Sequence, residues 1–412
     1  MKMDSPNVSD GRRSILRGVV AGSLASVLPA AIRAASEGAL ANLPFARGQR
    51  ELTDAFPQKH GVLLQRTRPP LLETPFAVFD RGVSTPNDRF FVRWHLANIP
   101  NQIDGAAFRI KVHGLVDKPL DLSLNELLTK FEPVHLTAVN QCSGNSRGFF
   151  SPRVAGGQWA NGAMGNALWT GVRLRDVLEW AGVKAGAVAV RFHGLETGVL
   201  PTTPMFMKSL QIDHARDGEV MIAYAMNGEP MPLLNGFPVR LIVPGWYSTY
   251  WVKMLSDIEV LGQPDDNFWM TKAYLVPDNP TGNVDPGQTG VSLVPISRML
   301  PRSFITNLLD GQHVHANTPL TVRGIAFGGD SGVRKVEVSS DGGSTWTGAR
   351  LGRDHGKYSF RQWEMRLSPK PGPLTLKVKA TNTDSLAQPA IANWNPGGYM
   401  RNVIESMTLL AT

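Results

Sequence analysis

The only cysteine of the 412-residue chain, Cys142, stands in a segment whose residue types could support chemistry at sulfur. A single cysteine cannot form an internal disulfide, complete a paired-cysteine metal site or attach a c-type haem. It can be a buried apolar residue, a nucleophile, or the one thiolate that binds a group held in a pocket. Gly144 permits a close backbone approach to a ligand, and Asn145 and Arg147 place a polar donor and a positive charge near the sulfur. These neighbours favour a thiolate with a function over simple burial.

Other segments carry side chains that the fold must bring to this cysteine. Residues 89–96 are expected to form a strand with Arg93 and His95 on one face, where a cation and an imidazole could bind an anion. A solvated strand face would have the same pattern. Residues 135–140 are expected to form a strand that delivers Cys142 to the following loop, where functional residues usually lie.

Two further cations, Arg240 and Lys253, fall at the edges of expected strands in a region with many glycine turns. Such turns, together with arginine and lysine, could cradle a phosphate without a P-loop. The sequence has no GxxxxGK[S/T] pattern and no GxGxxG pattern after a strand, so we do not expect nucleotide binding. We also expect no nucleic-acid partner, because the net charge of +8 is mild and no basic run alternates with aromatic residues.

The N-terminus has the pattern of an export signal. A twin arginine, Arg12-Arg13, precedes an apolar stretch of small residues at 18–32 that is too short for a membrane span. We therefore expect a twin-arginine signal peptide over residues 1–38, export of the folded protein to the periplasm, and no membrane span. With one cysteine, the exported protein must draw its stability from its hydrophobic cores rather than from disulfides.

The remaining length predicts two domains of different character. Residues 42–278 are expected to form a mixed α/β domain with an α+β arrangement, in which 42–85 are an irregular proline-rich arm. Within it, residues 169–182 are expected to be a helix that ends at glycine. Residues 288–412 contain short alternating strands separated by turns, which predicts an immunoglobulin-like β-sandwich for association. A proline-rich link at 277–286 separates the two.

Taken together, these segments resemble the sulfite oxidase family of molybdenum enzymes, and most closely the molybdopterin subunits of bacterial periplasmic sulfite dehydrogenases. The matching segments occur in the family's order and extend through both expected domains. They are residues 85–95 (TPNDRFFVRWH), 142–147 (CSGNSR), 162–176, 223–230, 236–240, 243–247, 340–346 and 388–395.

The resemblance implies a fold, a cofactor and a set of site residues. The fold would be a molybdopterin-binding domain followed by an immunoglobulin-like dimerisation domain. The cofactor would be molybdenum bound by molybdopterin and by one protein thiolate, that of Cys142, with no haem in this chain. The substrate pocket would contain Arg93, Arg147, Trp159 and Tyr274. The pterin and its phosphate would contact Phe91, Arg93, His95, Asn235, Arg240 and Lys253. Asn235 stands where many relatives have histidine, and Arg401 is the candidate for a further arginine that the family often has after Trp394-Asn395.

The resemblance also implies an activity. It is the oxidation of sulfite to sulfate, with electrons passed singly to a c-type cytochrome subunit or a soluble cytochrome c. One alternative is the sulfane dehydrogenase subunit of a periplasmic thiosulfate-oxidising complex. A non-enzyme alternative is a cofactor-free binding or assembly protein of the same fold. The sandwich would support either a homodimer or a heterodimer with a cytochrome.

Overall fold

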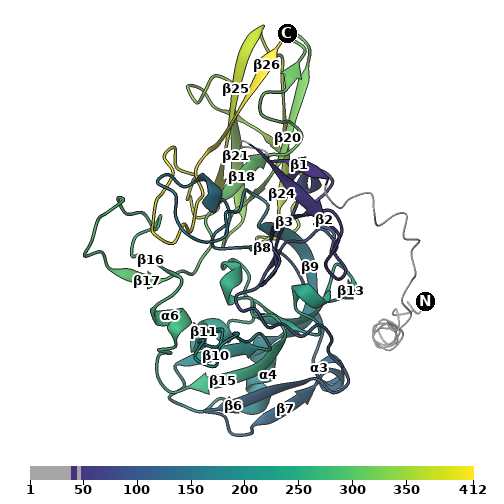
Figure 1. Cartoon of the computed structure of the whole chain (residues 1–412), viewed down its shortest axis with the longest axis vertical. Coiled ribbons are helices and arrows are strands. Elements are labelled where there is room, and N and C mark those ends of the chain that lie inside the picture. The colour runs from purple at the N-terminus through teal and green to yellow at the C-terminus, as the bar shows by residue number, and fades with distance from the viewer. Residues whose placement is uncertain (1–38, 44–47) are drawn as a thin grey trace, which may run out of the picture.

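The structure, a computed structural model, describes residues 39–43 and 48–412, which form a lower body and an upper β-sandwich (Figure 1). Most of the regular structure is β-strand, and the longest helix of the described residues, α4 (Leu174–Ala181), has 8 residues. The signal peptide expected over residues 1–38 lies outside the described residues. Among the described residues, no helix is both long and apolar enough to cross a membrane.

The central sheet of the lower body carries Cys142 to the loop where it sits. Its strands are β8 (Val134–Gln141), β9 (Met164–Arg173), β12 (Met221–Met226), β13 (Glu229–Pro230) and β14 (Arg240–Ile242). The order is β13-β12-β9-β8, and β14 pairs with β12. β8 ends directly before Cys142, which confirms the strand expected at 135–140. Every residue of β12 is buried, so this sheet forms part of the core.

The helix expected over 169–182 is wrong in its first five residues. Those residues belong to β9, and α4 begins only at Leu174. Gly171 packs so closely on β12 that a Cβ there would lie 2.1 Å from the carbonyl oxygen of Ile222. The close sheet contact overrides the helical pattern of the local sequence. The end of the helix is as expected, because Gly182 caps it in the left-handed conformation, with φ of 72°.

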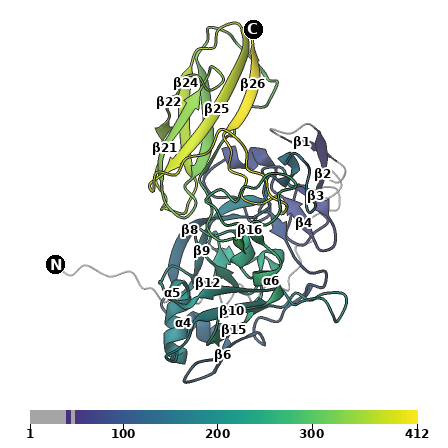
Figure 2. The ribbon, with the colours of Figure 1, turned by 90° about the vertical axis from the view of Figure 1, so that its left-hand side faces the viewer.

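A second sheet forms the far end of the lower body. Its strands are β6 (Arg109–Gly114), β7 (Leu120–Ser123), β10 (Ala189–Gly194), β11 (Met207–Gln211) and β15 (Leu255–Leu261). The order is β11-β10-β15-β6-β7, and only the β15–β6 pair is parallel among these strands. Helix α4 contacts β6, β9 and β12, so it joins the two sheets (Figure 2). Helix α3 (Leu124–Lys130) follows β7 directly, with Ser123 as its capping residue.

The arm expected to be irregular over residues 42–85 contains a sheet. Short strands β1 (Leu40–Asn42), β2 (Gln49–Thr53), β3 (Val62–Arg66), β4 (Leu71–Glu73) and β5 (Val92–Arg93) pair in that order. The prediction was wrong because Pro69 and Pro70 lie in the turn between β3 and β4, where they interrupt no strand. The 3-10 helix η1 (Phe76–Asp80) follows β4.

The strand expected over residues 89–96 is reduced to the two residues of β5. β5 pairs with β4, and side chains bind the backbone before and after these two residues. The carboxylate of Glu196 accepts hydrogen bonds of 2.8 Å from the backbone N–H groups of His95 and Leu96. On the other side, Lys59 Nζ donates to the carbonyl of Phe90 at 2.9 Å. These long-range contacts take the place of a longer ladder beyond the two residues of β5.

The upper body is a sandwich of two sheets, as the sequence predicts. One contains β18 (Arg302–Ile305), β20 (Leu320–Phe327), β24 (Arg361–Leu367) and β23 (Arg350–Leu351). The other contains β19 (His313–Val314), β26 (Glu405–Ala411), β25 (Gly372–Asn382), β21 (Val333–Ser339) and β22 (Thr347–Gly348). Buried and exposed residues alternate strictly along β26, so its apolar side faces the core between the sheets. Strands β16 (Leu275–Pro277) and β17 (Leu293–Pro295) pair in the segment that connects the two bodies.

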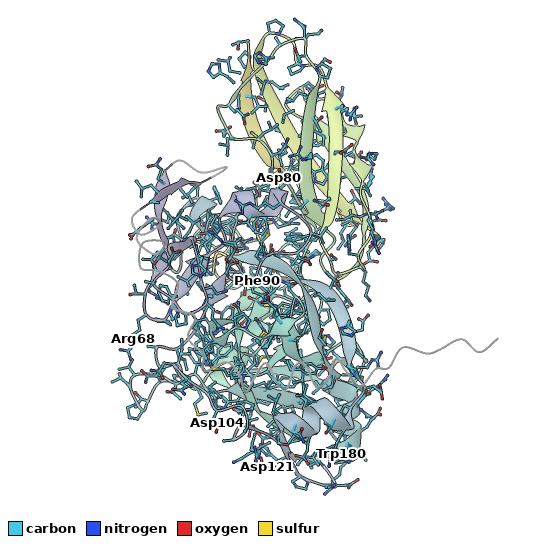
Figure 3. The ribbon with its side chains drawn as sticks, turned by 90° about the vertical axis from the view of Figure 1, so that its right-hand side faces the viewer. Arg68, Asp80, Phe90, Asp104, Asp121 and Trp180 are labelled. Atoms are coloured by element: carbon cyan, nitrogen blue, oxygen red, sulfur yellow. The ribbon has the colours of Figure 1, made fainter. Side chains whose placement is uncertain are left out.

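The two bodies are joined by polar contacts as well as by the connection. Asp80, at the base of the sandwich in Figure 3, accepts a hydrogen bond of 2.7 Å from Arg323 and one of 2.9 Å from Thr306. The segment between β25 and β26, drawn in yellow, descends from the sandwich to the lower body (Figure 1). Its Met400 N–H donates to the carbonyl of Ser143 at 3.1 Å, directly beside the cysteine.

Candidate active site

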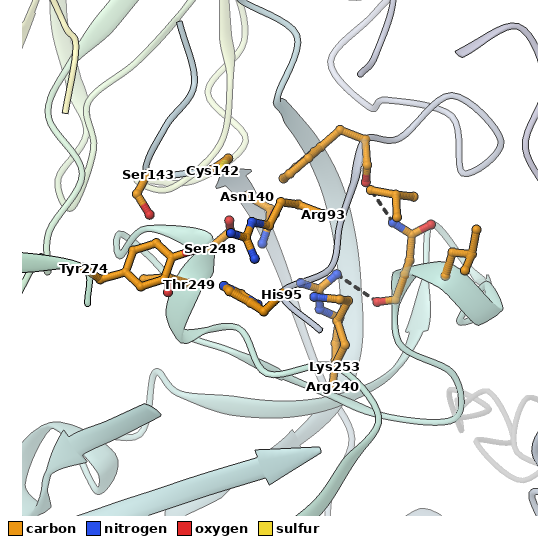
Figure 4. A pocket seen from close by; sticks show the side chains of 14 residues that line it. Arg93, His95, Asn140, Cys142, Ser143, Arg240, Ser248, Thr249, Lys253 and Tyr274 are labelled. Carbon is orange, nitrogen blue, oxygen red and sulfur yellow. Dashed lines mark hydrogen bonds between the residues drawn. The ribbon is translucent and has the colours of Figure 1, made fainter. Parts of the chain in front are cut away.

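A pocket in the lower body brings Cys142 together with most of the predicted site residues (Figure 4). It is lined by Phe91, Val92, Arg93, His95, Asn140, Cys142, Ser143, Leu234, Asn235, Arg240, Ser248, Thr249, Lys253 and Tyr274. The lining comes from β5, the end of β8, β14 and the segments that connect the strands, so distant parts of the chain build it.

Cys142 is a free thiol in the wall of this pocket, with 5 % of its surface exposed. Its N–H donates to Ala163 at 2.9 Å, and its carbonyl accepts from Asn145 N–H at 2.9 Å. The side chain of Asn145 in turn accepts from Ala163 N–H at 3.0 Å. The loop is therefore fixed by its own hydrogen bonds, and the position of the sulfur is set before any ligand binds.

Several polar atoms that face this pocket lack partners. Among the residues that the structure describes, buried side-chain atoms without a hydrogen-bond partner include Arg93 Nη1, His95 Nε2, Asn140 Nδ2, Ser143 Oγ, Arg240 Nε and Thr249 Oγ1. A buried polar group left unsatisfied costs about 1–3 kcal/mol, and native proteins contain few of them. Their concentration on one pocket, with donors predominating, indicates a site built for a polar, anionic ligand.

Positive charge concentrates at one end of the pocket. Burial lowers the pKa of Arg240 to about 9. Burial also lowers the pKa of Lys253 to about 7, where attraction from Glu196 opposes the shift and repulsion from Arg240 adds to it. Both pKa values lie below their ordinary range because burial removes the cations from water. An anion bound here would favour their charged forms.

Tryptophan rings hold these cations in place. The guanidinium of Arg240 lies 5.3 Å from the ring centre of Trp169 and 5.8 Å from that of Trp251. The ammonium of Lys253 lies 4.4 Å from the ring centre of Trp94. Arg240 also donates to the carbonyls of Asn235 at 2.9 Å and Trp251 at 3.3 Å, so its Nε is the donor left without a partner for a ligand.

His95 lies between the cations and the aromatic side of the pocket. Its ring stacks on Phe206, with ring centres 3.4 Å apart, and its Nδ1 lies 3.5 Å from a carboxylate oxygen of Glu196. Burial lowers the pKa of His95 well below its ordinary value, and repulsion from Arg93 and Lys253 adds to the shift. The imidazole is therefore neutral and can donate or accept one hydrogen bond.

Tyr274 forms the opposite wall (Figure 4). Its backbone has φ of 59°, an uncommon conformation for a bulky residue and one that the surrounding structure must hold in place. The guanidinium of Arg93 lies 5.8 Å from its ring centre, and the ammonium of Lys208 lies 5.7 Å away. Burial raises the pKa of Tyr274, so the phenol keeps its proton and can donate it in a hydrogen bond.

Two predicted substrate residues, Arg147 and Trp159, do not line the pocket itself. Arg147 donates to the carbonyls of Gly397 at 3.0 Å and Gly157 at 3.2 Å. Trp159 is almost completely buried in the same hydrophobic core as Cys142. Arg401 also lies elsewhere: it binds Glu405 at 2.9 Å.

Six lining residues were absent from the prediction: the apolar Val92 and Leu234, and the polar Asn140, Ser143, Ser248 and Thr249. Asn140 and Ser143 could have been found, because they lie two residues before and one residue after the cysteine. No sequence signal marks Ser248 and Thr249, since the fold alone brings their 3-10 turn η4 (Ser248–Tyr250) to the pocket.

Two family models match the chain, one mainly in the lower body and one mainly in the sandwich. Residues 95–269 match the family model of the oxidoreductase molybdopterin binding domain, and residues 294–408 match that of the Mo-co oxidoreductase dimerisation domain. Chicken sulfite oxidase is 32% identical over 360 residues, which cover 84% of this chain and 77% of that protein. The chain belongs to the sulfite oxidase family. This confirms the family, the fold class and the molybdenum–molybdopterin cofactor that the sequence predicts.

One more relative and one solved structure are similar to the chain. Mouse mitochondrial sulfite oxidase is 34% identical over 364 residues, which cover 84% of this chain. The match spans 65% of that protein's length, so the chain corresponds to about two thirds of the mitochondrial relative. The structure of the sulfane dehydrogenase SoxCD from Paracoccus pantotrophus has a TM-score of 0.73 at 22% identity. The alignment covers 99% of this chain and 93% of that one, which shows a shared fold over both bodies.

Proposed function

We propose that this protein oxidises sulfite to sulfate at a molybdenum–molybdopterin centre and passes the electrons singly to a c-type cytochrome. The observation that carries the proposal is the pocket in which one free thiol, an arginine with an unpaired donor and a protonated tyrosine converge. Membership of the sulfite oxidase family supports it, because the mouse and chicken relatives are sulfite oxidases.

In this proposal, the two ends of the pocket have different roles. Cys142 supplies the one protein thiolate to the metal. The cationic end binds the anionic part of the cofactor through Arg240, Lys253 and Thr249. Arg240 Nε and Thr249 Oγ1 lack a partner among the described residues, and burial lowers the pKa of Arg240 and Lys253, so an anion would favour their charged forms. When bound, the cofactor supplies the oxygen-atom transfer and accepts two electrons.

Arg93 and Tyr274 bind the substrate. Sulfite is a small oxyanion, and a guanidinium offers two parallel donors that match a pair of its oxygens. Arg93 has a buried Nη1 without a partner among the described residues, so it can make such a contact. Tyr274, kept protonated by burial, donates to an oxygen of the same anion. Arg147, held just outside the pocket, adds positive charge that favours the entry of an anion.

The electron acceptor, the location and the assembly are part of the same proposal. A single cysteine cannot attach a c-type haem, so the acceptor is a separate c-type cytochrome. The twin arginine Arg12-Arg13 supports export to the periplasm, where such cytochromes occur. The match of residues 294–408 to a dimerisation domain supports association through the sandwich, with a second copy or with a cytochrome subunit.

A steady-state assay on molybdenum-loaded protein tests the proposal. We expect one molybdenum per chain and sulfite-dependent reduction of cytochrome c. Protein that takes up no molybdenum would favour the cofactor-free binding or assembly protein instead. Loaded protein that fails to oxidise sulfite but reduces a cytochrome in the presence of a protein-bound sulfane would favour sulfane dehydrogenation.

A further inference from the structure

A second tyrosine, Tyr399, reaches the active site from the sandwich side of the chain. Its ring stacks on that of Tyr274, with ring centres 5.4 Å apart and planes 20° apart. The guanidinium of Arg147 lies 5.1 Å from the ring centre of Tyr399, and that of Arg93 lies 5.8 Å from the ring centre of Tyr274. The four side chains therefore contact one another in the order Arg93, Tyr274, Tyr399, Arg147.

The backbone of Tyr399 is fixed by two buried asparagines. Its N–H donates to Asn395 Oδ1 at 3.0 Å, and its carbonyl accepts from Asn393 Nδ2 and Asn395 Nδ2, each at 3.0 Å. Asn395 also donates to the carbonyl of Gly282 at 2.8 Å, which ties this turn to the segment between the two bodies. The next residue, Met400, binds the carbonyl of Ser143. The asparagines therefore fix the backbone of Tyr399, and the contact of Met400 with Ser143 holds it beside the cysteine loop.

The same turn holds Arg147 directly. The carbonyl of Gly397 accepts from Arg147 Nε at 3.0 Å. A Cβ at Gly398 would lie 2.7 Å from Arg147 Cγ, so only glycine leaves room for the arginine there. The turn also carries an arginine of its own, Arg401, but Glu405 binds it at 2.9 Å. The turn therefore brings an aromatic ring to the active site, while its own cation is used elsewhere.

Tyr274 needs such support. Tyr274 has φ of 59°, and a non-glycine residue held at positive φ persists only where its surroundings over-determine it. Offset stacking of two aromatic rings and a cation over a ring both favour one relative placement of the groups. Tyr399 makes both kinds of contact at once, with Tyr274 on one side and Arg147 on the other.

We propose that Tyr399 is a positioning residue of the active site, which holds the Tyr274 phenol and the Arg147 guanidinium in the arrangement that binds a small oxyanion. This inference rests on the proposed function, because it concerns the same site. It makes the turn at 393–401, between the last two long strands of the sandwich, a part of the catalytic machinery. The contribution of Tyr399 comes from its ring rather than from its hydroxyl.

Two substitutions separate the ring from the hydroxyl. Tyr399→Phe keeps the stack and the cation–π contact, so we expect kcat and KM for sulfite within about twofold of the native values. Tyr399→Leu removes both contacts, so we expect KM to rise about five- to tenfold as Arg147 loses its support, with a smaller fall in kcat. Ile391→Ala, at a residue 84% exposed in the same segment, is the matched control and should change neither constant.

A binding measurement gives a readout that needs no turnover. Sulfate, the product anion, should raise the thermal midpoint of the loaded protein, because a ligand that binds only the folded state stabilises it. We expect this shift to be native in Tyr399→Phe and reduced in Tyr399→Leu at equal molybdenum content. If sulfite proves not to be the substrate, the proposed function fails, but the sulfate shift still tests the role of Tyr399.

Several outcomes would overturn the inference. One is a Tyr399→Leu variant whose KM, kcat and sulfate shift equal those of the native protein. Another is a rise in KM that is equally large in the leucine and phenylalanine variants. Should leucine prevent folding, Tyr399→Met fills similar space without a ring, and native KM, kcat and sulfate shift in that variant would also refute it. The double variant Tyr399→Leu with Arg147→Lys adds a further check. If its fold-change in KM equals the product of the fold-changes of the two single variants, Tyr399 does not act through Arg147.

Discussion

Lys59 Nζ donates a hydrogen bond of 2.6 Å to Oδ1 of Asn235 at the edge of the pocket. The other end of that amide, Nδ2, donates to the carbonyl of Phe91 at 3.2 Å. Lys59 is fully buried and also donates to the carbonyls of Asn87 and Phe90. Both ends of the Asn235 side chain therefore bind the protein. In this structure the asparagine supports the segment that carries Phe91.

Replacement of Asn235 with leucine should test this support. Asn235→Leu removes a side-chain acceptor of the buried Lys59 ammonium, and an unsatisfied buried donor costs about 1–3 kcal/mol. We expect the free energy of unfolding to fall by about that amount, as measured by urea denaturation. Asn125→Leu, at an exposed position of α3, is the control and should have little effect. Equal stability of the two variants would contradict the role given to Asn235.

Lys59 should also make stability depend on pH. Burial lowers its pKa to about 7 in the folded protein, with attraction from Asp88 opposing the shift and repulsion from Arg240 adding to it, whereas a free lysine titrates near 10.4. Between these values the unfolded chain binds one more proton, so the free energy of unfolding rises with pH. Lys59→Met should lower this slope by about 1.4 kcal/mol per pH unit.

Urea denaturation at about pH 7.5 and about pH 9.5 measures the slope, since both values lie inside the window between the two pKa values. The control is Lys130→Met, which removes a lysine that is 49% exposed. A native slope in Lys59→Met would show that the buried amine does not titrate in this range.

The sequence predicts more of the site than of the elements that carry it. The residues next to Cys142, and the strand that ends before it, follow from local pattern. The strand expected around Arg93 does not form as predicted, because Glu196, about 100 residues away, binds the backbone instead. The Lys59–Asn235 contact likewise joins residues 176 positions apart. Contacts at such separation leave no periodicity in the sequence, so local reasoning cannot reach them.

Cys142→Ser should abolish turnover while the fold remains. Serine is nearly the same size and can replace the thiol in the wall, where the backbone of residue 142 is held by Ala163 and Asn145. A hydroxyl is not the soft thiolate ligand that the metal requires, so sulfite-dependent cytochrome reduction should be lost. Circular dichroism should match that of the native protein. Native activity in this variant would refute Cys142 as the metal ligand.

Arg93→Lys should raise KM for sulfite by about tenfold or more, because lysine retains the charge but lacks the planar pair of donors that matches an oxyanion. The change in kcat should be smaller if Arg93 serves mainly to bind the substrate. Arg109→Lys, at an exposed strand position, is the control. The measurement is steady-state kinetics normalised to molybdenum content, and a native KM in Arg93→Lys would exclude it from substrate binding.

A buried ion pair within the sandwich, whose arginine also contacts the cysteine loop, should be needed for both stability and activity. Arg302 Nη2 donates to Glu405 Oε1 at 2.7 Å, and its Nη1 donates to Ser146 Oγ at 3.0 Å. Arg302 and Glu405 are 1% and 5% exposed. Removal of one partner of such a pair leaves a buried charge uncompensated and costs about 3–5 kcal/mol. Glu405→Gln keeps the shape and part of the hydrogen bonding, so we expect a loss of unfolding free energy at the lower end of that range.

The loss should reach the active site, because Ser146 directly precedes Arg147 and holds φ of 71°. We therefore expect KM for sulfite to rise in Glu405→Gln at equal molybdenum content. The matched control is Glu364→Gln, whose partner Arg350 is 74% exposed. An exposed pair contributes little to stability, so urea denaturation of this control should be close to native. Equal stability and equal KM in the two variants would show that the buried pair does not couple the sandwich to the cysteine loop.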